Sequence, residues 1–132
     1  MRPEKKQRLK QRRHWRVRQK IRGTKECPRM SVCFTNRNIH VQFVDDTAGV
    51  TLAAASTLAK NIPERDKLAA NVSSAKTIGK LAAEAVLAKG ITQVVFDRGA
   101  ARYHWSKGKD GKRVCGKLAT LAEAAREAGL KF

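Results

Sequence analysis

Apolar and polar residues alternate along two neighbouring stretches near the start of the chain, 30–35 and 39–44. A period of two residues puts every second side chain on the same face of a strand, so both stretches are predicted β-strands. Polar residues at 36–38 predict the turn between them, and the acidic and glycine residues of 45–49 predict a second turn. The segment 50–56, with small residues on one face, is the predicted third strand and completes an antiparallel meander.

The period then changes from two to that of a helix. A helix is predicted from a cap at Ser73 or Ser74 to about Lys89, followed directly by a glycine, which commonly ends helices. The preceding segment, 58–72, is polar and contains Pro63. It is therefore predicted to be a loop with one short helical turn.

An almost wholly apolar segment at 92–97 predicts a short strand in the buried centre of the sheet. The next segment, 99–116, holds glycines and basic residues without an apolar period, which predicts an exposed loop. A last helix follows and is predicted to stop at Gly129. The side chains that it turns to the core are Leu118, Leu121, Ala122 and Ala125.

These elements predict an α/β fold in the order βββαβα. A helix that joins the third strand to the fourth requires a right-handed crossover and parallel strands. We therefore predict a mixed four-stranded sheet in the spatial order 3-2-1-4, with both helices packed on one face. Residues 23–132 form this domain, whose length supports a single core.

The first 22 residues have a different character. Eleven of them are Lys or Arg and one is acidic, Glu4, so this arm carries a formal charge of +10. Charge at this density repels itself, and the arm has too few apolar residues for a core of its own. We expect an arm that is disordered by itself and helical when an anionic partner neutralises it.

No apolar segment follows the basic N-terminus as in a signal peptide, and no stretch reaches the roughly 18 apolar residues of a membrane span. We therefore expect a soluble cytoplasmic protein without a membrane partner. The cysteines are odd in number and lack CxxC spacing, which favours reduced, buried thiols over a disulfide framework or a zinc site. They are Cys27, Cys33 and Cys115.

Two patterns suggest enzyme chemistry. Residues 111–117 match the first seven positions of a phosphate-binding loop, but Leu118 stands where a Ser or Thr must hold magnesium. The alternative we keep is a metal-dependent RNA nuclease of ribonuclease H-like topology. Its metal ligands are four acids near the strands, Asp45, Asp46, Glu84 and Asp97. Otherwise the sequence indicates no catalytic residue, cofactor, metal or small-molecule substrate.

Basic and aromatic residues are mixed in the arm and again in the loop at 99–116. Aromatic rings and guanidinium planes stack on unpaired bases, so two such clusters predict two contacts with structured RNA. A nonspecific nucleic-acid chaperone is a further class that such clusters fit. The residues concerned are Arg8, Arg12, Arg13, Trp15, Arg16, Arg18, Lys20 and Arg22 in the arm, and Arg98, Arg102, Tyr103, His104, Trp105 and Lys107 in the loop.

Short sequence motifs, spread over nearly the whole chain, resemble those of a known family. They are Gly23-Thr24, Pro28-Arg29-Met30-Ser31-Val32, Asn36-Arg37-Asn38-Ile39-His40-Val41-Gln42, Asp45-Asp46, Leu52-Ala53-Ala54-Ala55-Ser56-Thr57, Val94-Val95-Phe96-Asp97-Arg98-Gly99, Tyr103-His104 and Ala124-Ala125-Arg126-Glu127-Ala128-Gly129-Leu130. These motifs, in this order, resemble the bacterial large-subunit ribosomal protein eighteen.

The resemblance implies a non-catalytic protein of the large ribosomal subunit. Such a protein binds 5S ribosomal RNA and helps to dock it on 23S ribosomal RNA in the central protuberance, beside neighbouring 5S-associated proteins. The resemblance adds a third RNA surface to the arm and the loop. Its residues are Arg29, Asn36, Arg37, His40 and Gln42.

The chain departs from the family pattern in three ways. Cys33-Phe34 stands where the family usually has an aromatic and then a basic residue, and Cys27 stands at another basic position. His40 replaces a usual tyrosine. Residues 105–115 form an apparent insertion of about 11 residues, rich in basic side chains, which we interpret as an additional RNA contact.

Overall fold

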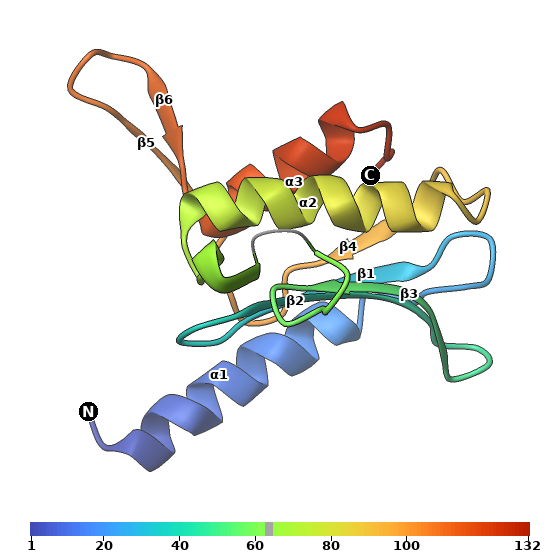
Figure 1. Ribbon diagram of the computed structural model, residues 1–132. Coiled ribbons are helices and arrows are strands. Elements are labelled where there is room, and N and C mark those ends of the chain that lie inside the picture. The colour runs from blue at the N-terminus through green and yellow to red at the C-terminus, as the bar shows by residue number, and fades with distance from the viewer. Residues whose placement is uncertain (63–64) are drawn as a thin grey trace.

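Four strands form one mixed sheet in the middle of the molecule (Figure 1). The computed structural model describes residues 1–62 and 65–132. The sheet contains β1 (Arg29–Phe34), β2 (Ile39–Asp45), β3 (Val50–Ser56) and β4 (Val95–Asp97). They lie in the order β3-β2-β1-β4, with β1 antiparallel to β2 and parallel to β4. The predicted fold class and strand order are confirmed.

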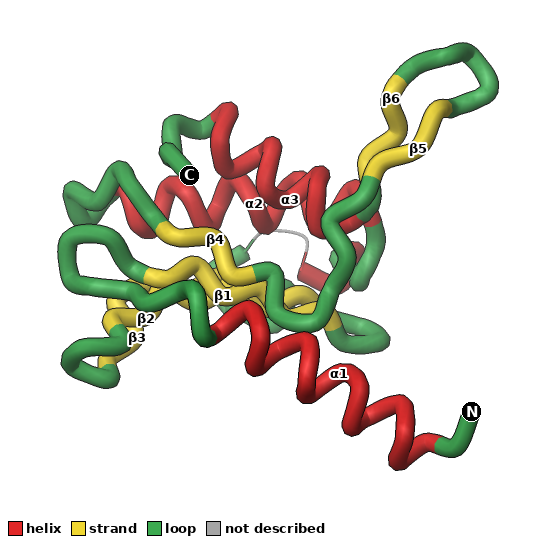
Figure 2. The backbone as a smooth tube through the Cα atoms, turned by 180° about the vertical axis from the view of Figure 1, so that it is seen from behind, coloured by secondary structure: helices red, strands yellow, loops and turns green. Residues whose placement is uncertain are grey.

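Helices lie on both sides of this sheet. The two predicted helices, α2 (Val72–Leu87) and α3 (Lys117–Glu127), together cover one face, and α1 (Pro3–Arg18) lies along the other (Figures 1 and 2). Alternate strand residues point to opposite faces, so one set from β1 and β2 enters the core beneath α2 and α3. That set is Met30, Val32, Ile39, Val41 and Phe43.

β4 is shorter than predicted, because the residues before it pair with the end of the chain instead of with β1. The Val94 amide donates to the Lys131 carbonyl at 3.1 Å, and the Lys131 amide donates to the Thr92 carbonyl at 2.9 Å. An extended apolar segment can pair equally well with β1 or with the end of the chain. The pattern over 92–97 therefore could not show where the sheet strand begins.

The cap of α2 is Asn71, so the prediction of Ser73 or Ser74 is wrong. The Asn71 side chain accepts a hydrogen bond from the Ser74 amide at 2.8 Å, while the Ser74 hydroxyl accepts one from a loop amide. Asn and Ser are equally good caps, so the local sequence did not decide between them. The predicted short helical turn is η1 (Arg65–Lys67), whereas Pro63 lies outside the described residues.

The segment predicted as an exposed loop, 99–116, contains an antiparallel hairpin. Its strands are β5 (Trp105–Lys107) and β6 (Arg113–Cys115), and Gly111 takes a φ of +72° in the turn. The hairpin projects away from the body of the domain (Figure 1). Three-residue strands are too short to show a period, so the sequence pattern missed them.

The arm, which we expected to be disordered by itself, is helical as α1. No residue of this helix is buried, although Leu9 and Val17 are half-buried. Good helix formers, Glu4 in the first turn and Arg16 in the last turn favour the helix through propensity and the helix dipole. Within the described residues, no helix is long and apolar enough to cross a membrane.

α2 and α3 approach each other closely at Gly79. A Cβ atom built on Gly79 would lie 2.5 Å from the carbonyl oxygen of Leu121 and 3.0 Å from the Cβ of Ala124. A glycine at this position therefore allows α3 to lie against α2. The contact places both helices over the sheet and fixes the base of the hairpin, which leads directly into α3.

We predict that Gly79→Ala lowers the free energy of unfolding by about 1–3 kcal/mol, because the added methyl group forces the helices apart. Alanine is the better helix former by about 1 kcal/mol, so a loss would show that packing outweighs propensity. Urea unfolding followed by circular dichroism measures the effect, with the exposed Lys80→Ala as the control. Equal or greater stability of Gly79→Ala would contradict the close contact.

Candidate nucleic-acid interface

Arg29 lies on the outer face of the sheet, the face toward α1, and joins several parts of the chain. Its Nε and Nη2 donate to Asp46 at 2.9 and 3.1 Å, and its Nη1 donates to Asp97 at 2.7 Å. The Asp46 carboxylate also accepts the Gly23 amide at 2.8 Å and lies 3.3 Å from Nη1 of Arg18. We call these five residues the Arg29 junction.

Two residues that the sequence assigned to RNA belong to this junction. The Arg29 side chain is 11% exposed and is surrounded by carboxylates, so its main role in the structure is to join Asp46 and Asp97. Arg18 is 33% exposed and attaches the end of α1 to Asp46. Sequence reasoning counted both as free cations because their acidic partners are far away along the chain.

Both the Arg29 guanidinium and the Asp46 carboxylate are stabilised in their charged forms, because each shifts the pKa of the other. Burial alone lowers the pKa of the Arg29 guanidinium, but hydrogen bonds and charge from Asp46 and Asp97 outweigh burial and leave the pKa raised. The hydrogen bond from Arg29 is the main cause that holds the pKa of Asp46 far below its ordinary value. Burial opposes this lowering of the pKa, and donation from Gly23 and Arg18 adds to it.

Apart from Arg18, the basic side chains of the arm face solvent. Residues four apart lie on one side of a helix, so Arg8, Arg12 and Arg16 form a stripe along α1. Trp15, beside this stripe, is 57% exposed. A stripe of cations with an exposed indole can contact successive phosphates and an unpaired base. The exposed predicted residues are Arg8, Arg12, Arg13, Trp15, Arg16, Lys20 and Arg22.

The outer face of the sheet adds a polar platform. Asn36 and Arg37 are exposed in the turn between β1 and β2, and Gln42 is exposed on β2. His40 is half-buried, and its Nδ1 lies 2.8 Å from the Ser56 hydroxyl on β3, which orients the ring. Four of the five residues predicted here to contact RNA therefore stay on or beside the outer face without a carboxylate partner, whereas Arg29 is held by Asp46 and Asp97.

Some residues of the loop after β4 are exposed to solvent, and others pack against the domain. Arg98 and Arg102 are exposed. Tyr103 meets Phe96 edge to face, with ring centroids 6.3 Å apart, and its hydroxyl accepts a hydrogen bond from Arg126 at 3.2 Å. Tyr103 is therefore largely a packing residue and offers a base only part of its ring.

His104 is exposed and stands at the base of the hairpin, where a Cβ on Gly116 would meet its ring at 2.6 Å. Trp105 is 55% exposed and lies under the guanidinium of Arg113, 5.2 Å from its ring centroid. Lys107 is exposed on the same hairpin. Together these residues form a second basic-aromatic surface at the base and along one strand of the hairpin.

The hairpin is attached to α3 through Glu123. The Arg113 guanidinium lies 3.5 Å from the Glu123 carboxylate, and the Cys115 thiol donates to the same carboxylate at 3.7 Å. The contact between Arg113 and Glu123 is solvent-exposed, so it is worth little as a stabilising pair. It nevertheless gives the hairpin a preferred direction relative to the domain.

The cysteines are free thiols, and the prediction that they are buried is wrong. Cys33 is exposed, because the alternation of β1 puts it on the outer face. Cys27 and Cys115 are half-buried in a turn and in the hairpin. Composition alone could not show which face of a strand a small thiol occupies.

The four acids of the nuclease alternative do not form a metal site. Asp45 accepts the Thr47 amide at 2.9 Å within its turn, Asp46 and Asp97 hold Arg29, and Glu84 is exposed on α2. Across residues 1–62 and 65–132, no three His, Cys, Asp or Glu side chains come together around a position for a metal.

The stretch that resembles a phosphate-binding loop is part of the hairpin and of the entry into α3. Its Gly111 amide donates to Gly108 at 3.0 Å, and its Gly116 amide donates to His104 at 3.0 Å. These amides already have partners. The two glycine amides of the stretch are therefore not free to cradle phosphates.

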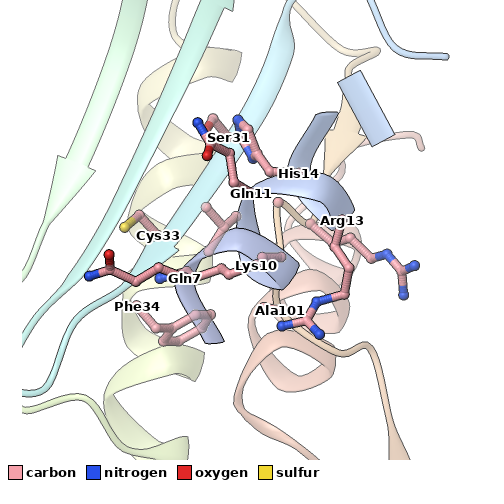
Figure 3. Close-up of a pocket in the computed structure, with 13 residues that line it drawn as sticks. Gln7, Lys10, Gln11, Arg13, His14, Ser31, Cys33, Phe34 and Ala101 are labelled. Atoms are coloured by element: carbon pink, nitrogen blue, oxygen red, sulfur yellow. The ribbon is translucent and has the colours of Figure 1, made fainter. Parts of the chain in front are cut away.

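A cleft of about 800 Å³ lies between α1, β1 and the loop after β4, and Figure 3 shows its lining. Several of its residues were missed by sequence reasoning. Gln7, Lys10, Gln11 and His14 recur at helical spacing, which would have marked one side of α1, but the partner surface was unknown. That surface comprises Ser31, Cys33 and Phe34 of β1 together with Arg98, Gly99 and Ala101.

Comparison with known proteins shows which family the chain belongs to. Residues 4–132 match the model of a family described as ribosomal L18 of archaea, bacteria, mitochondria and chloroplasts. A large ribosomal subunit protein uL18 of Petrotoga mobilis is 48% identical over 124 residues, covering 94% of this chain and 93% of that protein. The uL18 protein of Lactobacillus delbrueckii subsp. bulgaricus is 51% identical over 127 residues, covering 96% and 95%.

We predict that Asp46→Asn lowers the free energy of unfolding near neutral pH by about 2–4 kcal/mol, since it leaves Arg29 with one carboxylate fewer. The folded-state pKa of Asp46 is depressed, so its contribution is fully present above the unfolded pKa of about 4. That contribution is lost as the pH falls below this value. Urea unfolding at several pH values should show the gap between wild type and variant closing in acid.

The exposed Asp66→Asn, which changes the charge equally, serves as the control and should alter stability by less than about 0.5 kcal/mol. A gap for Asp46→Asn that stays constant from neutral to acidic pH would show that the carboxylate charge of Asp46 is not what stabilises the Arg29 junction.

Proposed function

The chain belongs to the ribosomal L18 family and is a structural protein of the large ribosomal subunit, and from this premise we propose that it binds 5S ribosomal RNA. In this role it helps to attach 5S to 23S ribosomal RNA in the central protuberance, beside other 5S-associated proteins. It works by holding RNA segments in place, without a chemical step.

The observation that carries this proposal is the placement of two basic projections. α1 and the β5–β6 hairpin extend from the same end of the domain, one from the sheet side and the other from the helical side (Figures 1 and 2). Each carries exposed arginine or lysine and an exposed tryptophan. Two separate cationic surfaces suit a protein that holds one RNA segment against another.

The proposed contacts fall into three groups. Arg8, Arg12 and Arg16 of α1 neutralise phosphates, which supplies affinity without sequence preference. The sheet platform around Arg37 and Gln42 offers hydrogen bonds to bases and ribose. The hairpin, through Trp105, Lys107 and Arg113, reaches a second segment.

Selective binding of 5S RNA is the direct test. We expect labelled 5S RNA bound by the protein to resist competition from an unrelated structured RNA of equal length, and the protein to co-purify with 5S RNA from dissociated large subunits. Equal competition by the unrelated RNA would instead indicate a nonspecific nucleic-acid chaperone.

We predict that Arg12→Gln combined with Arg16→Gln lowers the slope of log affinity for 5S RNA against log salt by about 1.4–1.8, because two phosphate contacts are lost. The matched control is Lys76→Gln combined with Lys80→Gln, which removes the same charge from the exposed side of α2. It should leave the slope nearly unchanged. Equal changes in both double variants would show that net charge matters rather than the surface of α1.

We further predict that a variant joining His104 directly to Gly116 melts within a few degrees of wild type. The Gly116 amide and the His104 carbonyl already lie 3.0 Å apart, so the ends can be joined with little movement. This variant should bind isolated 5S RNA more weakly and enter large subunits less efficiently. A large fall in melting temperature would show that the hairpin supports the core, and unchanged binding and incorporation would show that it contacts no RNA.

A further inference from the structure

We infer that the cleft between α1 and β1 binds an unpaired nucleotide of the RNA, an inference that deepens the proposed function and rests on it. The cleft measures about 800 Å³, within the range of about 300–1,000 Å³ that is usual for small-ligand sites. It is large enough to admit a base together with its sugar. The arm forms one wall and the sheet forms the other (Figure 3).

The lining combines three kinds of side chain that a nucleotide needs. The half-buried Phe34 of β1 and Ala101 of the loop supply apolar surface against which a base can lie. The side chains of Gln7 and Gln11, one helical turn apart on α1, can donate to and accept from a base edge. The two amides lie opposite Ser31 and Cys33 of β1.

The charge of the cleft suits the phosphates on either side of such a base. Lys10, Arg13 and Arg98 line it, and none of its lining residues is acidic. Within the described part of the chain, these three cations take part in no ion pair, unlike Arg18 and Arg29. They are therefore free to neutralise an RNA backbone that crosses the mouth of the cleft.

The shape favours a single strand over a duplex. In a duplex the faces of the bases are stacked on one another, and the major groove of A-form RNA is too narrow for side chains to read. Only an unstacked base can lie on a recessed apolar wall. The cleft therefore selects loops, bulges or ends, whereas the exposed stripe of Arg8, Arg12 and Arg16 serves either form.

Cys33 makes the inference measurable, because this exposed thiol lines the cleft. In a variant with Cys27→Ser and Cys115→Ser, we expect hexauridylate to slow the alkylation of Cys33 about tenfold at ten times its dissociation constant. A short blunt-ended RNA duplex at equal occupancy should protect much less. A protein whose single cysteine is placed by Thr77→Cys, exposed on α2, should show no protection.

The second measurement fills the cleft without changing the charge. Cys33→Trp should weaken hexauridylate binding roughly tenfold, the scale of one lost base-stacking contact, and should leave duplex binding unchanged. Thr77→Trp, which adds the same ring to the opposite side of the domain, is the control and should leave both unchanged.

The outcomes separate this inference from the proposed function. Selective binding of 5S RNA, with Cys33 still freely alkylated and Cys33→Trp without effect, would overturn the cleft site and leave the proposed function standing. Equal protection by single strand and duplex would also overturn it. Protection of Cys33 by hexauridylate without selective 5S binding would support the cleft and contradict the proposed function.

Discussion

The ion pairs of Arg29 hold together the parts of this protein that we propose to face RNA. One guanidinium joins the end of β2 to the end of β4 through Asp46 and Asp97, and Asp46 in turn holds the Gly23 bend and the last turn of α1. Gly23 is buried, and a Cβ there would lie 2.3 Å from the carbonyl oxygen of Val44. The arm therefore leaves the sheet in one direction because both its bend and its final turn are attached to the same carboxylate.

The same junction shapes the charge of the surface. Two acids close to the outer face of the sheet are held by Arg29, and Asp45 accepts hydrogen bonds from the amides of its own turn. Apart from Arg18, the cations of α1 and of the loop after β4 form no ion pair among the residues that the structure describes. A surface of one charge sign attracts a polyanion over a distance and speeds its association.

The helices that form the core and the side chains proposed to contact RNA lie on opposite faces of the sheet. α2 and α3 pack on one face of the sheet and leave the opposite face to polar side chains, to α1 and to the cleft. α2 and α3 pack closely against each other at Gly79. Glu123 of α3 contacts Arg113 and so orients the hairpin. Recognition elements that are fixed by a rigid scaffold lose less conformational freedom when they bind.

The sequence by itself determined the strands of the meander, both core helices, the strand order and the two basic-aromatic regions. These follow from local periods and composition, which neighbouring residues express together. Only the tertiary structure decided the role of Arg29, whose partners lie 17 and 68 residues away, and the pairing of residues 93 and 94 with the end of the chain. It also decided the packing of Tyr103 and the existence of the cleft. Each of these depends on which distant segments meet, and no local pattern of hydrophobic and polar residues records that.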